Sequence, residues 1–371
     1  MKKSSAPISA ENKSLPAAAY TSAEFFRAEI EHIHRRNWFF VGRADEIPAA
    51  GDFRAVDTVA GPVLLVRDLA GELRAFANCC RHRGSLLLSG SGNRRAIVCP
   101  YHGWGYRLDG RLAGAPEMEG VAGFRAEEHG LLPIRMELWQ GFIFLTLAPE
   151  APALLDHLGN LPAVFGSHRL DEMVCTWRIE FDAACNWKLL VENAMEAYHT
   201  GYIHATSVGA QTAAEIETTG EWACIQVLSD ESVAVLGDAP RPFPPIAGLT
   251  AEAQRGTYFS MILPTTQFAV AQDSMWWLQM RPLAADRTIL SIGGCFPRAI
   301  TARPDFEAKA APYYERWKLV GEEDVRMLEM QQRGLASALH RPGPLGPRER
   351  IIHRIDRWVL DRIPDSAISL G

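Results

Sequence analysis

Two histidines and a carboxylate lie close together in the stretch from Asn186 to His204, with a spacing that could serve a metal ion. Glu196 and His199 are three residues apart, so on a helix they share one face. His204 would point away from that face unless the helix loosens or ends near Gly201. Two imidazoles suit iron, copper or zinc, and a third ligand must come from elsewhere. The alternative is a core helix with two incidental histidines.

A second group of metal-binding residue types offers one thiolate and one imidazole in each of two short segments. Cys80 and His82 form a C-x-H motif, and Cys99 and His102 form a C-x-x-H motif after sixteen intervening residues. This set matches a Rieske-type [2Fe–2S] cluster, in which two neutral imidazoles raise the reduction potential. Zinc is the alternative, but zinc fingers usually keep the cysteine pair and the histidine pair in separate halves. The mixed halves favour the iron–sulfur cluster, and Cys79 has the wrong offset to take part.

The elements around these cysteines and histidines read as short strands with turn residues between them. Residues 62–67 and 72–77 bracket the turn signal at 68–71, and Asp109-Gly110 marks a second hairpin. Asp-Gly favours tight hairpins because both residues tolerate a positive φ. We therefore predict an all-β domain over residues 38–150.

The rest of the chain mixes helices and strands. Residues 1–37 contain an arm and a helix that we expect to pack on the catalytic domain at 151–371. In that domain, the alternating strand pattern of 174–181 leads into the first histidine stretch, further strands follow between 210 and 300, and 306–340 is mostly helical. The predicted fold class is α+β, with the all-β domain joined to an antiparallel sheet covered by helices.

The overall composition is that of an ordinary globular protein, with 47% hydrophobic and 22% charged residues in a chain of 371. The net charge of −6 gives no general attraction to nucleic acid or to an anionic membrane. No apolar run approaches the ~20 residues of a membrane span or follows the N-terminal lysines as in a secretory signal. The seven scattered cysteines favour metal or redox chemistry over a disulfide framework. We expect a cytoplasmic protein without nucleic-acid or membrane partners.

The two cysteine–histidine segments resemble those of the Rieske domain in ring-hydroxylating oxygenases. The similarity includes Asn78, two residues before the first cysteine ligand, and Arg83-Gly84 after the first histidine ligand. The stretch 186–204 resembles the mononuclear iron motif of the same family, and the two motifs occur in the family's order. The resemblance extends over almost the whole chain. It implies the large (alpha) subunit of a Rieske non-heme iron oxygenase, with a helix-grip-like catalytic domain.

The resemblance also supplies a third ligand for the mononuclear iron. In the family, this ligand belongs to an acidic pair that is followed by Glu, Gln and Gly-Leu. Residues 323–335 have the same pattern at the same offsets, which places the ligand at Asp324. Without the resemblance, these residues would indicate the acidic N-terminal turn of an exposed helix. With His199 and His204, Asp324 would bind Fe(II) and leave coordination positions for O2 and substrate.

An electron path is implied as well. The cluster would take electrons from a separate NAD(P)H-dependent reductase that carries flavin and an iron–sulfur centre, because this chain has no Gly-rich dinucleotide fingerprint and no second ferredoxin set. Family members form head-to-tail rings, usually homotrimers. His102 would donate a hydrogen bond to Glu196 of the adjacent subunit, and Glu196 would also accept one from His199. Asn193, in the same motif, is grouped with Glu196 as a candidate catalytic residue.

Glu196 also bears on the substrate, because most family members have Asp there. Glu at this position resembles the carnitine and choline monooxygenase branch, whose members act on quaternary ammonium compounds. Aromatic faces attract such cations, although most of the aromatic residues in this region would also suit an ordinary core. The candidates for the substrate pocket are Tyr202, Tyr258, Phe259, Phe268, Trp276 and Trp277.

We therefore predict the oxygenase component of a multicomponent monooxygenase that hydroxylates a small organic substrate or cleaves its C–N bond. One alternative is hydroxylation of an aromatic ring, or O- or N-demethylation of an aromatic substrate, at the same site. Another is an electron carrier with a vestigial second metal site.

Overall fold

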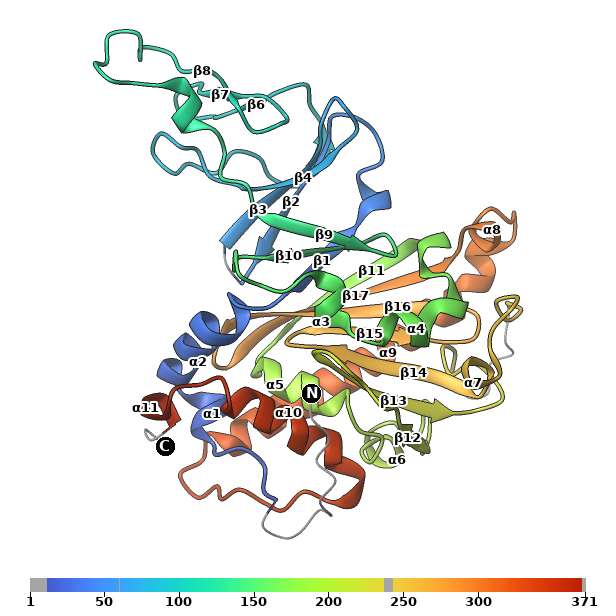
Figure 1. Cartoon of the computed structure of the whole chain (residues 1–371). Coiled ribbons are helices and arrows are strands. Elements are labelled where there is room, and N and C mark those ends of the chain that lie inside the picture. The colour runs from blue at the N-terminus through green and yellow to red at the C-terminus, as the bar shows by residue number, and fades with distance from the viewer. Residues whose placement is uncertain (1–11, 60, 237–242, 369–371) are drawn as a thin grey trace. The chain divides into compact units, whose positions relative to one another are not determined.

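The structure, a computed structural model, divides into two compact units (Figure 1). Residues 40–151 form the first, here called the β unit, and residues 1–39 with 152–371 form the second, called the α+β unit. The predicted α+β fold class is confirmed, because one unit is built from small sheets and the other combines a large sheet with helices. The structure describes residues 12–59, 61–236 and 243–368.

Short antiparallel strands build the β unit. Their bounds are β1 (Phe39–Arg43), β2 (Asp52–Thr58), β3 (Gly61–Arg67), β4 (Leu73–Ala77), β5 (Ser91–Asn93), β6 (Ile97–Val98), β7 (Gly105–Tyr106), β8 (Leu112–Gly114), β9 (Arg135–Trp139) and β10 (Phe142–Thr146). They form sheets in the orders β1-β10-β9, β4-β3-β2-β5 and β6-β7-β8. Two short 3₁₀ helices, η2 (Ala44–Glu46) and η3 (Ala126–His129), lie between them.

Both predicted hairpin turns are present in the β unit. Residues 68–71 connect β3 to β4, and Asp109-Gly110 lies between β7 and β8. Gly110 has φ +89°, and an added Cβ would come within 2.5 Å of the Phe76 ring. A side chain at this position would therefore meet both backbone strain and a clash. Phe76 belongs to the same buried cluster as Cys80 and Cys99, so the turn packs against the core that holds both cysteines.

One seven-stranded sheet dominates the α+β unit. Its strands are β11 (Met173–Ala183), β12 (Ala213–Glu215), β13 (Trp222–Leu228), β14 (Gly256–Ile262), β15 (Thr266–Val270), β16 (Met275–Ala284) and β17 (Arg287–Pro297). The spatial order is β11-β17-β16-β15-β14-β13-β12, and every neighbouring pair is antiparallel. Only β11 leaves the simple up-and-down order, because the first strand of the sheet pairs with the last.

Helices flank this sheet. The larger ones are α2 (Ala23–Glu29), α5 (Trp187–Asn193), α9 (Phe306–Leu335) and α10 (Arg350–Leu360). The short helical segments are α1 (Ala18–Thr21), η1 (Ile30–His34), α3 (Leu154–Leu158), α4 (Leu161–Phe165), η4 (Gly166–His168), η5 (Leu170–Glu172), α6 (Thr200–Ile203), α7 (Ala251–Gln254), α8 (Arg298–Thr301), η6 (Pro347–Glu349) and α11 (Asp365–Ile368).

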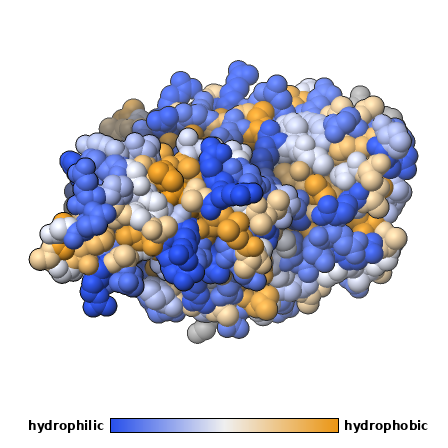
Figure 2. Space-filling view, turned by 90° about the horizontal axis from the view of Figure 1, so that it is seen from above, coloured by the Kyte–Doolittle hydropathy of each residue, from blue (hydrophilic) through white to orange (hydrophobic). Residues whose placement is uncertain are grey.

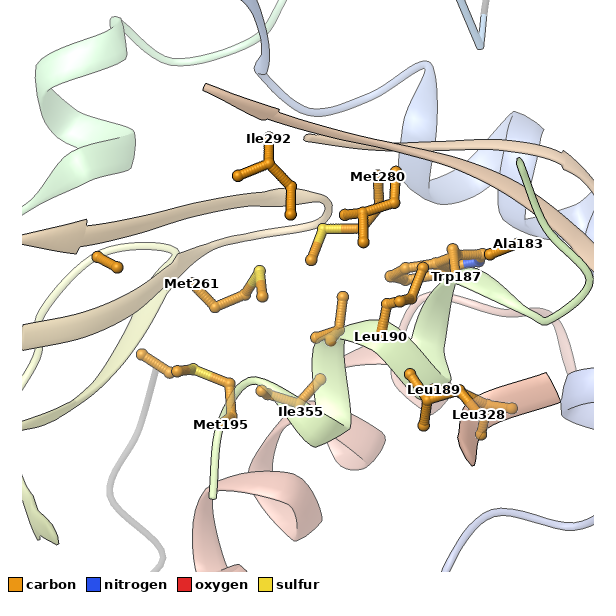
Figure 3. Close-up of a cluster of buried hydrophobic side chains, with 14 of the residues drawn as sticks. Ala183, Trp187, Leu189, Leu190, Met195, Met261, Met280, Ile292, Leu328 and Ile355 are labelled. Atoms are coloured by element: carbon orange, nitrogen blue, oxygen red, sulfur yellow. The ribbon is translucent and has the colours of Figure 1, made fainter. Parts of the chain in front are cut away.

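Helix α5 is packed between the sheet and two other helices (Figure 3). Leu190 points toward the strand residue Met280, whereas Leu189 points toward Leu328 of α9. These residues are at most 4% exposed, and they belong to one continuous core cluster with Ile355 of α10. Because the helix is enclosed on both sides, all of residues 187–192 are buried, including the charged Lys188 and Glu192.

The N-terminal helices hold α5 through buried polar contacts. Lys188 Nζ lies 2.5 Å from Glu29 Oε1, and the indole nitrogen of Trp187 donates to Glu29 Oε2 at 3.1 Å. Tyr20 donates its hydroxyl hydrogen to Glu192 at 2.8 Å. Burial raises the pKa of Glu29, although Lys188 and Trp187 act in the opposite direction. Helices α1 and α2 thus fix the helix that leads into the histidine stretch.

Hydrophilic and hydrophobic residues are interspersed on the face shown in Figure 2. Across the described ranges of the chain, no helix has both the length and the apolar character needed to cross a lipid bilayer.

Candidate metal centres

The histidine stretch is broken into two helices. Helix α5 ends at Asn193 and α6 begins at Thr200, so Glu196 lies between them. The prediction that Glu196 and His199 share one face of a continuous helix is therefore wrong. The physical reason is that Glu196 Oε2 accepts hydrogen bonds from the backbone N–H groups of Tyr198 and His199, which holds the chain in a turn. Its other oxygen nevertheless bonds to His199 Nδ1, so the two side chains still meet.

His199, His204 and Asp324 converge, although Asp324 comes from the distant helix α9. One ligand atom from each of the three lies within 4.8 Å of the others. Asp324 Oδ1 is 3.1 Å from His204 Nε2 and 3.8 Å from His199 Nε2. Two imidazole nitrogens and one carboxylate oxygen form the donor set typical of non-heme Fe(II) oxygenases.

The two imidazoles present the same nitrogen to the centre. His199 Nδ1 is bonded to Glu196, and His204 Nδ1 lies 2.7 Å from Glu323 Oε2. A carboxylate on Nδ1 fixes the proton there and leaves the Nε2 lone pair free for a metal. His204 Nε2 is buried and lies close to Asp324 Oδ1, but it forms no hydrogen bond with that oxygen or with any other atom of the described residues. A metal ion would satisfy this atom, so the residues present fit a mononuclear iron.

Electrostatics around His204 reinforce this arrangement. Burial by itself lowers the pKa of His204, but the carboxylates of Asp324 and Glu323 outweigh it and raise the pKa overall. Negative charge that favours an imidazolium also favours a divalent cation at the same place. Glu323 is further held by Ser207, whose hydroxyl donates to the same oxygen at 2.7 Å.

A contact from Asn193 positions Asp324. Asn193 Nδ2 donates to Asp324 Oδ1 at 3.3 Å, so this predicted catalytic residue contacts a candidate ligand directly. From the sequence, Glu323 was named only as part of the acidic pair and as an alternative ligand, and its contact with His204 was not foreseen because the two acidic residues look alike when their helical directions are unknown. The only available signal was that Glu323 immediately precedes Asp324.

A cavity opens onto the three candidate ligands. Its lining combines Glu196, His199, His204 and Asp324 with mainly apolar side chains from α5, the sheet and α9. Examples of the apolar lining are Leu190, Phe259, Trp276, Leu278, Met280 and Ile292. A mostly apolar cavity with a few convergent polar groups is the usual form of a small-molecule site.

The predicted aromatic pocket needs correction. Trp276 and Phe259 line the cavity, but Tyr258 and Trp277, the residues beside them in sequence, do not. Successive side chains of a strand point to opposite faces, so each pair can contribute only one member. Tyr258 instead packs within 6 Å of the Phe165 and His168 rings.

Two other predicted pocket residues also lie elsewhere. Phe268 is paired directly with Trp277 in the sheet and shares its face, away from the cavity. Tyr202 is 76% exposed and is not part of the lining. Trp317 of α9 does line the cavity, but sequence reasoning missed it because nothing in a long helix shows which side faces the sheet.

In the β unit, the two cysteine–histidine loops have the same backbone hydrogen bonds. The N–H groups of Cys80 and Cys99 each donate to the carbonyl oxygen five residues later, at 2.8 Å in both loops. The glycines four residues after each cysteine, Gly84 and Gly103, donate back to the cysteine carbonyl at 2.9 and 3.1 Å. Both glycines have φ +72°, a conformation that L side chains rarely adopt.

These twin loops place two buried thiols beside two exposed imidazoles. Cys80 and Cys99 are 4% and 3% exposed, whereas His82 and His102 are exposed, with ring centroids 4.8 Å apart. The Tyr106 hydroxyl lies 3.2 Å from Cys80 Sγ. Burial opposes ionisation of Cys99, but hydrogen bonds from its own loop and from Cys80 lower its pKa overall. The donor set therefore fits a Rieske [2Fe–2S] cluster.

Comparison with known protein families agrees with both centres. Residues 37–125 match the Rieske [2Fe-2S] domain, and residues 170–365 match the catalytic domain of the ring hydroxylating alpha subunit. The second match alone covers more than half of the chain. This chain belongs to the ring-hydroxylating alpha-subunit family. The prediction of the family is confirmed, and with it an oxidoreductase that uses a Rieske cluster, a mononuclear iron and O2.

Individual relatives share most of its length. The glycine betaine monooxygenase oxygenase subunit of Pseudomonas aeruginosa is 29% identical, with 89% of this chain and 84% of the relative covered. The chloroplastic choline monooxygenase of Beta vulgaris is also 29% identical, with 93% and 76% covered. One similar solved structure is that of a quaternary ammonium Rieske monooxygenase, which is described in terms of carnitine oxidation and inter-subunit electron transfer. Its sequence is 25% identical, and the TM-score is 0.81, with 95% of this chain and 96% of that chain covered.

Proposed function

We propose that this chain is the oxygenase component of a monooxygenase that oxidises a quaternary ammonium compound. The observation that carries the proposal is the cavity lined by His199, His204 and Asp324 together with the aromatic residues Phe259 and Trp276. Aromatic faces attract quaternary ammonium groups, and a substrate held there would lie beside the iron. The relatives named for glycine betaine, choline and carnitine support the same substrate class.

Each metal group has a proposed set of ligands. Cys80, His82, Cys99 and His102 would hold the Rieske cluster, and His199, His204 and Asp324 would hold the mononuclear iron. When bound, the iron supplies activation of O2. Overall, one oxygen atom enters a substrate C–H bond and the other leaves as water, with two electrons from NAD(P)H and two protons.

The chain's own residues would hold and orient the reactants. Glu196 and Glu323 keep the two imidazoles turned with Nε2 toward the iron, and Asn193 steadies Asp324. The apolar lining excludes water from the reacting carbon. When that carbon is bonded to the quaternary nitrogen, hydroxylation gives a hydroxyalkylammonium ion whose C–N bond breaks to leave an aldehyde, a tertiary amine and a proton. Cleavage of the C–N bond is the expected outcome of hydroxylation at that carbon.

Electron delivery would involve two partners. A separate NAD(P)H-dependent reductase with flavin and an iron–sulfur centre would reduce the cluster, because the chain has no Gly-rich dinucleotide fingerprint and no second ferredoxin-type cysteine set. In a homotrimer, His102 of one subunit would then donate to Glu196 of the next, whose second oxygen already bonds to His199. The quaternary ammonium monooxygenase described in terms of inter-subunit electron transfer supports this arrangement.

The substrate class is tested by turnover with a surrogate reductase and NADH. Glycine betaine, choline, L-carnitine and γ-butyrobetaine form one panel, and naphthalene, indole and a methoxybenzoate form the other. We expect substrate-dependent O2 uptake with an aldehyde and a tertiary amine as products from at least one compound of the first panel. Turnover confined to the aromatic panel would replace the proposal with aromatic oxygenation.

The electron path is tested by Glu196→Gln with Glu196→Asp as its matched control. Glutamine keeps the size of the side chain but removes the charge that strengthens a hydrogen bond to each imidazole. In single-turnover experiments on pre-reduced protein, we expect reoxidation of the cluster to slow by orders of magnitude while both metal sites stay occupied. Glu196→Asp should retain part of the rate. Reoxidation of Glu196→Gln at the wild-type rate would refute the intersubunit path.

A further inference from the structure

A buried arginine lies in the wall of the cavity. Arg316 of α9 is 4% exposed and lines the cavity together with Asp324, which follows about two helical turns later. Its guanidinium carbon is 4.8 Å from the centroid of the Trp276 ring, so the group is stacked on an aromatic wall. Burial lowers the pKa of Arg316 to about 10, and the carboxylates of Asp324 and Glu323 act against this decrease. The side chain is therefore still charged at neutral pH.

This charge has no ion-pair partner among the described residues. Arg316 makes no hydrogen bond to another described residue, and its Nε is fully buried without an acceptor. The indole nitrogen of the adjacent Trp317, which also lines the cavity, is likewise buried and without an acceptor within the described part of the chain. Buried donors without acceptors are rare, because each one costs free energy, so each needs an explanation.

The acidic residues nearest to Arg316 are already engaged elsewhere. Asp324 faces the two histidines and Asn193, and Glu323 bonds to His204 and Ser207. Neither carboxylate lies within ion-pair distance of Arg316. The remaining acceptor must come from the cavity itself. A planar guanidinium presents paired N–H groups that match a carboxylate, and such pairs are commonly bidentate.

We propose that Arg316 binds a carboxylate group of the substrate and thereby selects zwitterions over simple cations. This inference rests on the proposed function for the quaternary ammonium part of the substrate and adds the anionic part. A compound such as a betaine would place its carboxylate at Arg316 and its ammonium end elsewhere in the cavity. A cation with no anionic group would instead meet a like charge that has no ion-pair partner among the described residues.

A purely structural role makes a different prediction. If Arg316 served only to stack on Trp276 and to balance the acidic pair 323–324, its replacement would disturb all ligands alike. If Arg316 binds a carboxylate, its replacement must reduce the affinity only for ligands that carry a carboxylate. Glycine betaine and choline separate these cases, because they share the trimethylammonium group and differ in carboxylate against hydroxymethyl.

The experiment measures dissociation constants by calorimetry on the oxidised holoprotein, which requires no turnover. The ligands are glycine betaine and choline, γ-butyrobetaine and its amide, and benzoate and benzyl alcohol. The variants are Arg316→Gln, Arg316→Lys and, as the matched control, Arg333→Gln at an exposed position of the same helix. The Rieske absorption and the thermal unfolding midpoint show that each variant is folded.

We expect the wild type to bind each carboxylate-bearing quaternary compound at least 10-fold more tightly than its cationic counterpart without a carboxylate. Arg316→Gln should weaken carboxylate binding by about 100-fold, leave choline unchanged or improve it, and thus abolish the preference. Arg316→Lys should keep part of the preference because the charge remains without the paired N–H groups. Arg333→Gln should bind as wild type. In turnover, KM should rise for the carboxylates with a smaller change in kcat.

Equal binding of the paired compounds by the wild type would overturn the inference, and so would a preference that survives in Arg316→Gln. If the wild type binds the two members of each quaternary pair equally tightly, the proposed function stands and the role of Arg316 is refuted. Preference for benzoate alone, dependent on Arg316, would uphold the carboxylate site and refute the quaternary ammonium substrate. Absence of binding in all three series would refute both.

Discussion

The two candidate metal centres differ in how far apart in sequence their residues lie. In the β unit, all four proposed ligands fall within 23 residues, on two loops with the same backbone hydrogen bonds. In the α+β unit, Asp324 lies 120 residues beyond His204 and reaches it only because α9 packs on the sheet beside α5. The first centre is a property of local turns, whereas the second is a property of the packed core.

Burial differs in the same way. The β unit hides its thiols and exposes its imidazoles, as an electron acceptor that must meet a partner requires. The α+β unit buries His204 at 1% exposure and fixes each imidazole by a carboxylate. An exposed site can exchange electrons, and an enclosed one can control what reaches its metal. The comparison predicts that changes in one unit leave the other centre intact.

The largest effect should come from removing one ligand in each unit. Cys80→Ala should eliminate the Rieske absorption and EPR signal and reduce the iron content from about three atoms per chain to about one. His204→Ala should leave the Rieske signal unchanged and remove the single mononuclear iron. Both variants should lose turnover. Spectra and iron analysis measure each change.

The neighbouring Cys79 provides the control for this pair of variants. Cys79→Ala should retain the Rieske signal and the full iron content, because its thiol is assigned no metal. Loss of the cluster in Cys79→Ala with retention in Cys80→Ala would show that the ligand register is wrong. Loss of both centres from either single ligand variant would contradict the independence of the two units.

The next effect concerns the buried pair that fixes α5. Glu29→Gln leaves the buried ammonium of Lys188 without a charged partner, which should reduce the free energy of unfolding of the α+β unit by about 3–5 kcal/mol. Glu31→Gln is the matched control, because Glu31 forms an exposed pair with Arg35 and should change stability by less than about 1 kcal/mol. Urea unfolding measures both. Similar losses in the two variants would mean that burial of the pair does not matter.

A smaller effect is expected from the carboxylate behind His204. Glu323→Gln removes the charge that orients Nδ1, and should weaken Fe(II) binding by about 10- to 100-fold without changing the Rieske signal. Competition with a chelator measures this affinity. Glu322→Gln, at the exposed neighbouring position, should bind iron as wild type. Equal affinities in Glu322→Gln and Glu323→Gln would show that this hydrogen bond does not support the metal.

The contrast also explains which features the sequence could reveal. The C-x-H and C-x-x-H spacing, the Asp109-Gly110 hairpin and the histidine stretch are local patterns, and local turn geometry carries them into the structure. The helical face expected for Glu196 failed because its side chain bonds to backbone N–H groups, a competition that periodicity does not show.

Features set by packing could not be read in this way. Trp276 faces the cavity and Trp277 does not, and only the register of the sheet decides between them. Arg316 and Trp317 line the cavity because of how α9 lies on the strands, and nothing in the helix sequence fixes that rotation. The family resemblance supplied Asp324, which periodicity alone would have left as an exposed acidic turn.

The smallest effect should come from the twin glycines of the β unit. Gly84 and Gly103 both have φ +72°, and an added Cβ would meet nothing within 4 Å at Gly84 and only Pro116 at 3.8 Å at Gly103. Alanine at either position therefore meets backbone strain without a steric clash, which should cost about 1–2 kcal/mol in each case. Asparagine, which tolerates this conformation better, should cost less than alanine.

The temperature at which the Rieske absorption is lost measures the effect. Gly114→Ala is the control, because Gly114 has an ordinary φ and open space around it. Matching losses at the two positions would support the equivalence of the loops. A loss at one position with none at the other would show that the cluster rests mainly on a single loop, and the local symmetry that distinguishes this centre from the packed one would disappear.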